Sequence, residues 1–274
     1  VTGDDITTHA LLNIKRWALD IGDRSLEEIQ RKWPIAYRFL HEVVKPTRTP
    51  ESLKSYEGLM DRWWQFWNHR ADLMRRLREH EEFVAFSKVT KHPIGMLAPT
   101  GWVYTNKVVL IGLERQDLLA ICLSSSFRSW VEKYSGAGLG TTFQLSVRES
   151  LDTFPLPERA VSQDGIVSAA RFNEVAIQWC RSHDAGLTDL MNAFHCPENA
   201  EEMIAELREC LQSIDVEVLK AYGWSDLDVA FDFRELNGLP TNDRWRFCVK
   251  QDVRAELISR LLNLNRDRSD VADA

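Results

Sequence analysis

The sequence predicts an α+β protein: a small mixed or antiparallel β region with long helices, followed by an all-α, bundle-like region. Between residues 82 and 113, short apolar runs alternate with turn residues, a pattern typical of strands. The segments on either side of that stretch carry apolar residues every three or four positions, as amphipathic helices do. After residue 161 the helical spacing dominates, and the second region is therefore expected to contain helices alone.

The N-terminal segment is expected to be helical. Helices are predicted at about 8–20 and 26–44, and Pro46 would end the second because proline cannot donate a helical hydrogen bond. Residues 46–50 begin and end with proline and would form a stiff linker. A long helix is predicted for about 50–82, since its apolar residues fall mostly at three- and four-residue steps. That apolar face would consist of Leu59, Trp63, Trp67, Met74 and Leu77.

The middle of the chain contains the predicted strands. The three apolar runs are residues 83–86, 94–97 and 108–111. A helix is expected at about 115–134, where apolar side chains again follow the helical period. A Gly-rich loop at 135–140 and a strand at 141–147 would follow it.

A rigid, extended segment, Phe154-Pro155-Leu156-Pro157, marks the predicted boundary between two domains. The remainder is largely helical, with helices expected at about 165–182, 200–222 and 250–264. The second of these has the apolar spacing of a helical bundle, and Gly223 would end it. The predicted segments of the chain are therefore 1–49, 50–160 and 161–274.

Composition and charge describe a folded protein with two unlike halves. The 274 residues are 44% hydrophobic and 27% charged, and no apolar run reaches the length of a membrane span. The net charge is −7, but residues 1–150 carry a small positive excess while residues 151–274 are strongly acidic. The five cysteines form no CxxC pair, which favours reduced thiols in the cytoplasm over disulfides or a zinc site.

The sequence lacks the motifs of several enzyme classes. It contains no Asn-Pro dipeptide, and therefore no Asn-Pro-Pro-aromatic loop to grip a flipped adenine. A Walker A loop, an HExxH motif and a GxSxG motif are also absent. The Gly-rich residues 136–140 follow a predicted helix and precede a predicted strand, the reverse of the order in a nucleotide-binding turn. We therefore expect no catalytic residue, metal site or cofactor site in this chain.

Loops that carry cations and hydroxyls form the candidate binding site. Lys88, Thr90, Lys91 and His92 lie between predicted strands, where such side chains reach phosphates and base edges; a solvated turn explains them equally well. Around the Gly-rich loop, backbone N–H groups can contact a phosphate, and the flanking arginines would add a positive rim. Surface arginines commonly have no such role. The candidates around this loop are Gly136, Gly138, Thr141, Thr142, Arg128 and Arg148.

An aromatic cluster, Trp63, Trp64, Phe66 and Trp67, has two interpretations. It would serve as a base-stacking platform if exposed. Aromatic residues at helical spacing more often belong to a core, and we favour the core with Trp64 half exposed.

Eight short motifs, in this order along the chain, carry a resemblance to a known family. They are Gly3-Asp4-Asp5-Ile6, Val44-Lys45-Pro46-Thr47-Arg48, Arg62-Trp63-Trp64-Gln65-Phe66-Trp67, Leu123-Ser124-Ser125-Ser126-Phe127, the Gly/Thr loop 136–142, Asp152-Thr153-Phe154-Pro155-Leu156-Pro157, Ala221-Tyr222-Gly223-Trp224-Ser225-Asp226-Leu227 and Arg260-Leu261-Leu262-Asn263-Leu264-Asn265. Through them the sequence resembles the region that follows the catalytic domain in MmeI-like and related class I adenine-N6 DNA methyltransferases. Those proteins are restriction–modification enzymes and methylases of phage defence.

The resemblance implies a role for each segment. Residues 1–49 would be a helical connector from a methylase core that lies outside this sequence, residues 50–160 a target-recognition domain, and residues 161–274 helices that clasp the duplex. The partners would be double-stranded DNA and the N-terminal methylase domain of the same polypeptide, with no membrane. The parent enzyme would use S-adenosylmethionine, but none of its catalytic or cofactor residues has a counterpart here. The first residue, Val1, is consistent with a fragment or a processed product.

Three alternatives remain open at the level of sequence. The acidic half would dock a basic partner if the chain were a protein–protein interaction module of a larger defence complex. An enzyme with an unfamiliar site is the second alternative. A defence methylase without nuclease activity is the third, and nothing in these residues separates it from a restriction enzyme.

Overall fold

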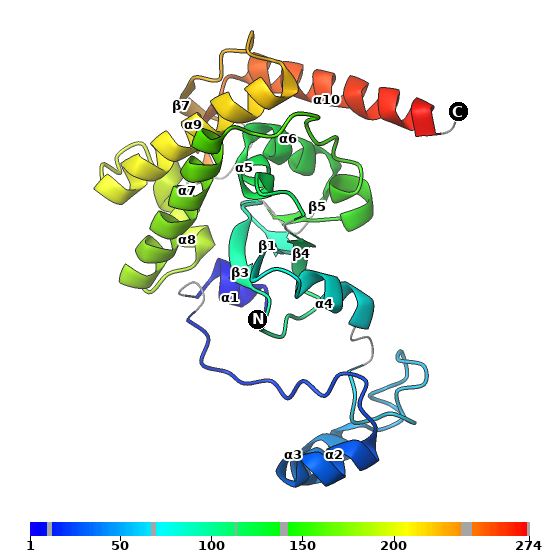
Figure 1. Cartoon of the computed structure of the whole chain (residues 1–274). Helices are drawn as coiled ribbons and strands as arrows, with labels where there is room; N and C mark the ends of the chain where they lie inside the picture. The colour runs from blue at the N-terminus through cyan, green and yellow to red at the C-terminus, as the bar shows by residue number, and fades with distance from the viewer. Residues whose placement is uncertain (10–12, 67–69, 113, 138–141, 237–242, 273–274) are drawn as a thin grey trace. The chain divides into compact units, whose positions relative to one another are not determined.

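The computed structural model describes residues 1–274 except 10–12, 67–69, 113, 138–141, 237–242 and 273–274 (Figure 1). Its contacts divide the chain into two compact units, of which unit 1 comprises residues 1–14 and 82–274 and unit 2 comprises residues 15–81. Both long helices and small antiparallel sheets are present, and the predicted α+β class is confirmed. The two units cut across the three predicted segments, whose separate roles stay a prediction.

Unit 2 contains a short helical run and a set of turns. Its helical elements are α2 (Leu26–Lys32), α3 (Pro34–Phe39), η1 (Leu40–Val44), η2 (Lys45–Thr47) and α4 (Ala71–Leu77). Ser25 begins α2 by accepting a hydrogen bond from the Glu28 backbone N–H at 3.2 Å. The predicted helix at 26–44 is thus confirmed, with an interruption at Trp33, the residue before Pro34.

Two predicted helices of this region are wrong. Residues 13–20 have no helical assignment, and Trp17 is 99% exposed, so the apolar spacing there has no packing partner to stabilise a short helix. Within the described part of 50–82, only α4 is an α-helix. Gly58 and Arg70 adopt φ of 69° and 47°, left-handed conformations that interrupt a right-handed helix.

Of the aromatic cluster, Trp63 and Trp64 belong to a small core, as favoured from the sequence, whereas Phe66 is exposed and Trp67 lies outside the described residues. Trp63 and Trp64 pack against buried Ile21, Ile29 and Leu40. The indole N–H of Trp64 donates to a backbone carbonyl of the 21–25 turn at 2.9 Å. Both indoles are half-buried, which agrees with the expected partial exposure.

Unit 1 is built around a three-stranded antiparallel sheet. β1 (Glu82–Ser87) lies between β3 (Met96–Pro99) and β4 (Val108–Gly112), with Val84 opposite both Leu97 and Ile111. The predicted strands are confirmed, and residues 83–86 are fully buried. A second sheet joins β2 (Val89–Thr90), β6 (Phe143–Gln144) and β5 (Gly136–Ala137).

The predicted helix at 115–134 is divided into α5 (Leu118–Leu123) and α6 (Ser125–Tyr134). Ser124 between them is extended, and its hydroxyl accepts the Phe127 N–H and so begins α6. The predicted strand at 141–147 is shorter than expected, because Ser146 accepts the Glu149 N–H and begins the helical turn η3 (Val147–Leu151).

The C-terminal part of unit 1 is mostly helical, as predicted. It contains α7 (Gln163–Ser182), α8 (Leu187–His195), α9 (Glu202–Tyr222) and α10 (Gln251–Ala272). α7 packs along α9, whose apolar stripe from Ile204 to Val218 is buried (Figure 1). Gly223, with φ of 77°, ends α9 as expected.

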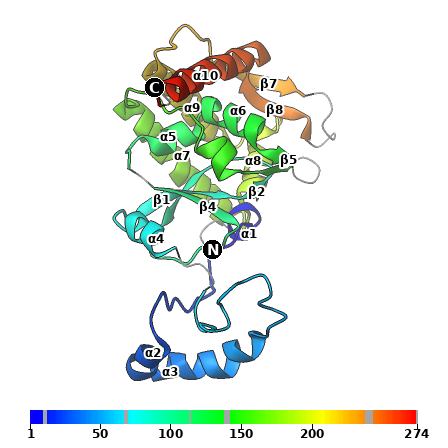
Figure 2. The same ribbon diagram turned by 90° about the vertical axis from the view of Figure 1, so that its right-hand side faces the viewer.

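A β-hairpin departs from the expected all-α composition of this part. β7 (Phe231–Glu235) pairs antiparallel with β8 (Trp245–Val249). One face of the hairpin carries Phe231, Phe233, Phe247 and Val249, and this apolar face packs on the helices. The hairpin lies beside α10 in both views (Figures 1 and 2).

In unit 1 the N-terminal residues pack against segments that are far away in the sequence. The short helix α1 (Asp4–Thr7) contacts β1 and α8. Gly186 lies so close to the backbone of α1 that a Cβ atom there would be 2.4 Å from the Thr7 carbonyl carbon. In the part of the chain that the structure describes, no helix has the length and hydropathy needed to cross a membrane.

Candidate nucleic-acid interface

Two buried histidines lie at the centre of the candidate interface. His92 follows β2, and His195 ends α8. Their ring centroids are 5.3 Å apart, and both side chains are almost completely buried. Charged and polar side chains from the same two segments, from α6 and from residues 243–246 surround them. The histidine–arginine cluster consists of Lys91, His92, Arg128, Asn192, His195, Asp243 and Arg246.

Both imidazoles are neutral in the folded protein. The Phe247 backbone N–H donates to Nδ1 of His195 at 3.1 Å, so this nitrogen carries a lone pair. Nε2 of His92 lies 3.3 Å from Asn192 Oδ1, an acceptor, and therefore carries the proton. Burial, and next the Arg246 charge, lowers the pKa of His92 to about 3. Burial and the Arg128 charge lower the pKa of His195 well below its ordinary value.

Lys91 connects the loop after β2 to two distant segments. Its ammonium donates to Asn192 Oδ1 at 2.9 Å and forms an ion pair with Asp243, which precedes β8. The two charged side chains are only 16% and 13% exposed. The Lys91 charge is already paired with Asp243 in a largely buried environment. Lys91 therefore holds the segment before β8 in place and is not positioned to contact a phosphate.

Arg128 and Arg246 have a different environment. Both are half-buried and lie close enough to the two histidines to affect their protonation. Arg246 donates one hydrogen bond, to the Trp245 carbonyl at 2.9 Å. Among the described residues neither guanidinium has a carboxylate within ion-pair distance. A guanidinium has five N–H donors, so most of this donor capacity is unused.

Asp215 is a buried carboxylate at the start of α6. It accepts the Ser125 backbone N–H at 2.6 Å, and its second oxygen has no hydrogen-bond partner. Burial raises the pKa of Asp215 to about 6, although the hydrogen bonds from Ser125 oppose this shift. The residue therefore stabilises the start of α6, the helix that carries Arg128.

The other predicted site residues are distributed unevenly. The Thr90 side chain is buried, donates to the His92 carbonyl at 2.7 Å and accepts the His92 N–H, so its polar atoms are occupied. Arg148 is exposed on η3, Gly136 is exposed in β5, and Lys88 and Thr142 are half-buried. The predicted residues Gly138 and Thr141 lie outside the described part of the chain.

The structure adds residues to the cluster that sequence reasoning did not select: Asn192, His195, Asp243 and Arg246. A signal for Arg246 exists in the sequence. Apolar and charged residues alternate in Phe-Asp-Phe-Arg-Glu and again at 245–249, a pattern typical of a half-buried hairpin. Asn192 and His195 have no comparable signal, because they are ordinary polar positions on a helix.

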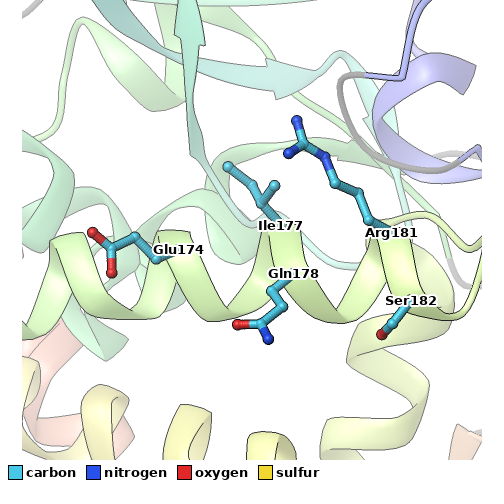
Figure 3. A pocket seen from close by; sticks show the side chains of 5 residues that line it. All are labelled: Glu174, Ile177, Gln178, Arg181 and Ser182. Atoms are coloured by element: carbon cyan, nitrogen blue, oxygen red, sulfur yellow. The ribbon is translucent and has the colours of Figure 1, made fainter.

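An open hollow on α7 does not form a catalytic arrangement. It is lined by Glu174, Ile177, Gln178, Arg181 and Ser182, all from one helix. Figure 3 shows Ile177 and Arg181 on one side of the helix axis and Gln178 and Ser182 on the other, so the functional groups do not converge. Within the described residues, no group of three or more His, Cys, Asp or Glu side chains is placed to hold a metal ion.

A second hollow lies where α9, α10 and the segment at 158–159 meet. Its central cation, Arg260, already donates two hydrogen bonds to Asp226, at 2.8 and 2.6 Å. Arg268 donates to the Leu156 carbonyl at 2.8 Å. These hydrogen bonds from Arg260 and Arg268 hold α10 against the rest of unit 1.

Comparison with known proteins finds a likeness in structure alone. No family model matches the chain, and no curated protein matches it. The fold resembles part of a restriction–modification enzyme whose structure has been solved in complex with DNA. That enzyme is MmeI, of Type IIL; the TM-score is 0.57 and the identity 14%. The match covers 98% of this chain and 30% of the MmeI chain, so this chain spans less than a third of that protein.

Proposed function

We propose that this chain is the sequence-specific DNA-recognition region of a restriction–modification enzyme, an adenine-N6 DNA methyltransferase. The observation that carries the proposal is the fold. Nearly the whole chain corresponds to one segment of an enzyme that was solved with DNA. The catalytic domain and the S-adenosylmethionine site would lie elsewhere in the polypeptide, in the same arrangement that the sequence resemblance implies.

The proposal distributes the predicted residues between two roles. Exposed Arg148 and half-buried Lys88 and Arg128 would contact backbone phosphates, because their charges lie at least partly in solvent. Thr90, Lys91 and His92 would support the interface from within, since their polar atoms are occupied by other groups of the protein. Gly136 and Thr142 flank the loop that would approach the duplex.

Selection from a pool of random duplexes tests this function. The whole chain is incubated with the pool, and bound duplexes are recovered and sequenced over several rounds. Enrichment of one short motif is the expected result, with binding that weakens steeply as salt rises. A matched pool of single strands is the control. Failure to retain any duplex at low salt, or retention without enrichment of a motif, would contradict sequence-specific recognition.

The enzymatic half of the proposal has its own test. The full-length polypeptide is incubated with tritiated S-adenosylmethionine and the selected duplex. Methyl transfer to adenine is expected, and it should disappear when the adenine of the motif is replaced. Transfer to cytosine, or none with a full-length protein that binds the duplex, would refute the assignment to adenine-N6 methylation.

A further inference from the structure

Four arginines meet where α6, α10 and the polar face of the β7–β8 hairpin approach one another. Arg246 and Arg234 are directly opposite each other on the hairpin. Arg128 and Arg254 lie on α6 and α10, and their charges act on Cys248 of the same hairpin face. The arginine cluster consists of Arg128, Arg234, Arg246 and Arg254.

The carboxylates near the arginine cluster pair with Arg254, with Arg234 and with Lys91, and among the described residues none forms an ion pair with Arg128 or Arg246. Glu132 forms an ion pair with Arg254 at 2.5 Å. Asp232 lies 4.0 Å from Arg234, at the limit of an ion pair, and is itself largely exposed. Asp243, the carboxylate nearest in sequence to Arg246, is paired with Lys91.

Arg128 and Arg246 therefore form the unpaired part of the arginine cluster. Asp215 offsets the Arg128 charge only partly, because it is buried against the start of α6 and hydrogen-bonded to Ser125. The Nε atom of Arg234 is buried without a hydrogen-bond partner, which adds a third unused donor direction. The two histidines beneath are neutral, so the positive charge at this place comes from the arginines alone.

Partly buried, unpaired guanidinium groups are energetically costly unless an anion meets them. Burial lowers the pKa of Arg246, a sign that its charge is poorly solvated in the protein alone. Phosphate is an anion that suits such groups, because guanidinium N–H groups donate to two of its oxygens in parallel. Supplying the anion would satisfy donors that the protein leaves without partners.

We propose that the arginine cluster binds one phosphodiester group of the DNA backbone, held by Arg128 and Arg246. This inference rests on the proposed function and extends it to the β7–β8 hairpin, where no individual DNA-contacting residue was predicted. The Lys91–Asp243 ion pair joins the segment before β8 to the loop after β2, and the His92–Asn192 hydrogen bond joins that loop to α8. They act as positioning groups, because they hold the hairpin that carries Arg246.

Salt-dependent DNA binding tests the phosphate contact. Fluorescence anisotropy of a labelled duplex is measured for the whole chain at several salt concentrations. Arg128→Gln and Arg246→Gln should each lower the slope of log Kd against log salt by about one. Arg128→Lys should largely restore the slope, because it keeps the charge. Arg171→Gln is the control, since Arg171 lies on α7 and is already paired with Glu206 at 2.6 Å.

The outcomes separate this inference from the proposed function. If the wild-type chain binds the duplex and both glutamine variants keep its salt slope, the phosphate contact is wrong and DNA recognition stands. If the wild-type chain binds no duplex, both are overturned. A titration with inorganic phosphate, followed by thermal unfolding, distinguishes a small-anion site. Stabilisation by phosphate that both variants lose, without a change in DNA binding, would also refute the DNA contact.

Discussion

Acidification should destabilise unit 1 through His92 and His195. Both imidazoles are neutral in the fold, and protonation of His195 at Nδ1 would remove its hydrogen bond from the Phe247 N–H. In the unfolded chain each ring takes a proton near the ordinary pKa of 6.5. The unfolded state therefore binds more protons below that pH, and the free energy of unfolding falls as pH falls.

The size of this loss of stability follows from the pKa shifts of the titrating groups. Below about pH 6.5, each neutral histidine lowers the free energy of unfolding by about 1.4 kcal/mol per pH unit. From there to about pH 4.5 His92 alone removes about 2.5 kcal/mol, and His195, whose pKa is also lowered, adds to that loss. Asp215 acts in the opposite direction below its raised pKa of about 6, because its folded form takes the proton first. It returns about 2 kcal/mol, so the net loss is what remains of the His92 contribution together with the contribution of His195.

Urea unfolding followed by far-ultraviolet circular dichroism measures the effect. Wild-type protein is compared with the double variant His92→Gln, His195→Gln over the same pH range. The slopes of unfolding free energy against pH should differ by at least about 1.4 kcal/mol per unit, the contribution of His92 alone. Asp215→Asn is the matched control, and it should steepen the wild-type slope below pH 6 by about 1.4 kcal/mol per unit. Parallel slopes for the wild-type and the double variant would show that the histidines are not held neutral.

Three further predictions concern packing and backbone. Lys91→Ala should lower the free energy of unfolding, measured in urea, by about 2 kcal/mol, because it breaks the ion pair with Asp243. A double-mutant cycle with Asp243→Ala should show a coupling energy of about 1 kcal/mol or more. Additive losses from the two single variants would refute the ion pair. Gly186→Ala should lower the free energy of unfolding by about 2 kcal/mol or more, because the new Cβ would be 2.4 Å from the backbone of α1. The control is Gly101→Ala, where nothing lies within 4 Å of the new Cβ and stability should change by less than about 0.5 kcal/mol. Equal losses in the two variants would contradict the close approach of Gly186 to α1. Gly223→Ala should lower the melting temperature through a loss of about 1 kcal/mol, since its φ is 77°, and an unchanged melting temperature would argue against a left-handed helix end.

The sequence predicted those helices and strands whose apolar residues form one uninterrupted buried run or stripe. The strands at 82–112 are short apolar runs between turn residues, and local composition alone indicates them. The α9 stripe from Ile204 to Val218 repeats the helical period for several turns, and Gly223 adds an end signal. Local pattern and tertiary packing agree in both cases.

The segment at 50–82 shows where local pattern fails. Its tryptophans fall at helical spacing, but they pack on a core made by Ile21, Ile29 and Leu40, and Gly58 and the residue before α4 turn the chain out of helical geometry. Periodicity records that side chains share a face; it does not say which backbone conformation brings them there.

The candidate site was predictable only in part. Lys91 and Arg128 were both selected as cations near loops, yet Lys91 meets Asp243, 152 residues further along the chain, and Arg128 meets no carboxylate among the described residues. Whether a cation is paired within the protein or is free to bind a ligand depends on the partners that the fold brings next to it. The sequence did not predict the β7–β8 hairpin, and so it could not predict that Asp243, just before β8, is the partner of Lys91.

The order of the two units along the chain has a consequence for how such a protein changes over time. Residues 1–14 belong with residues 82–274, and α1 packs on β1, the first strand after unit 2. Unit 2 is thus an insertion whose two ends leave from neighbouring elements of its host. It has a small core of its own around Ile29 and Leu40. Replacement of the insert by another of similar span would leave the hydrogen-bonded registers of the host sheets as they are, so one framework can carry many different inserts.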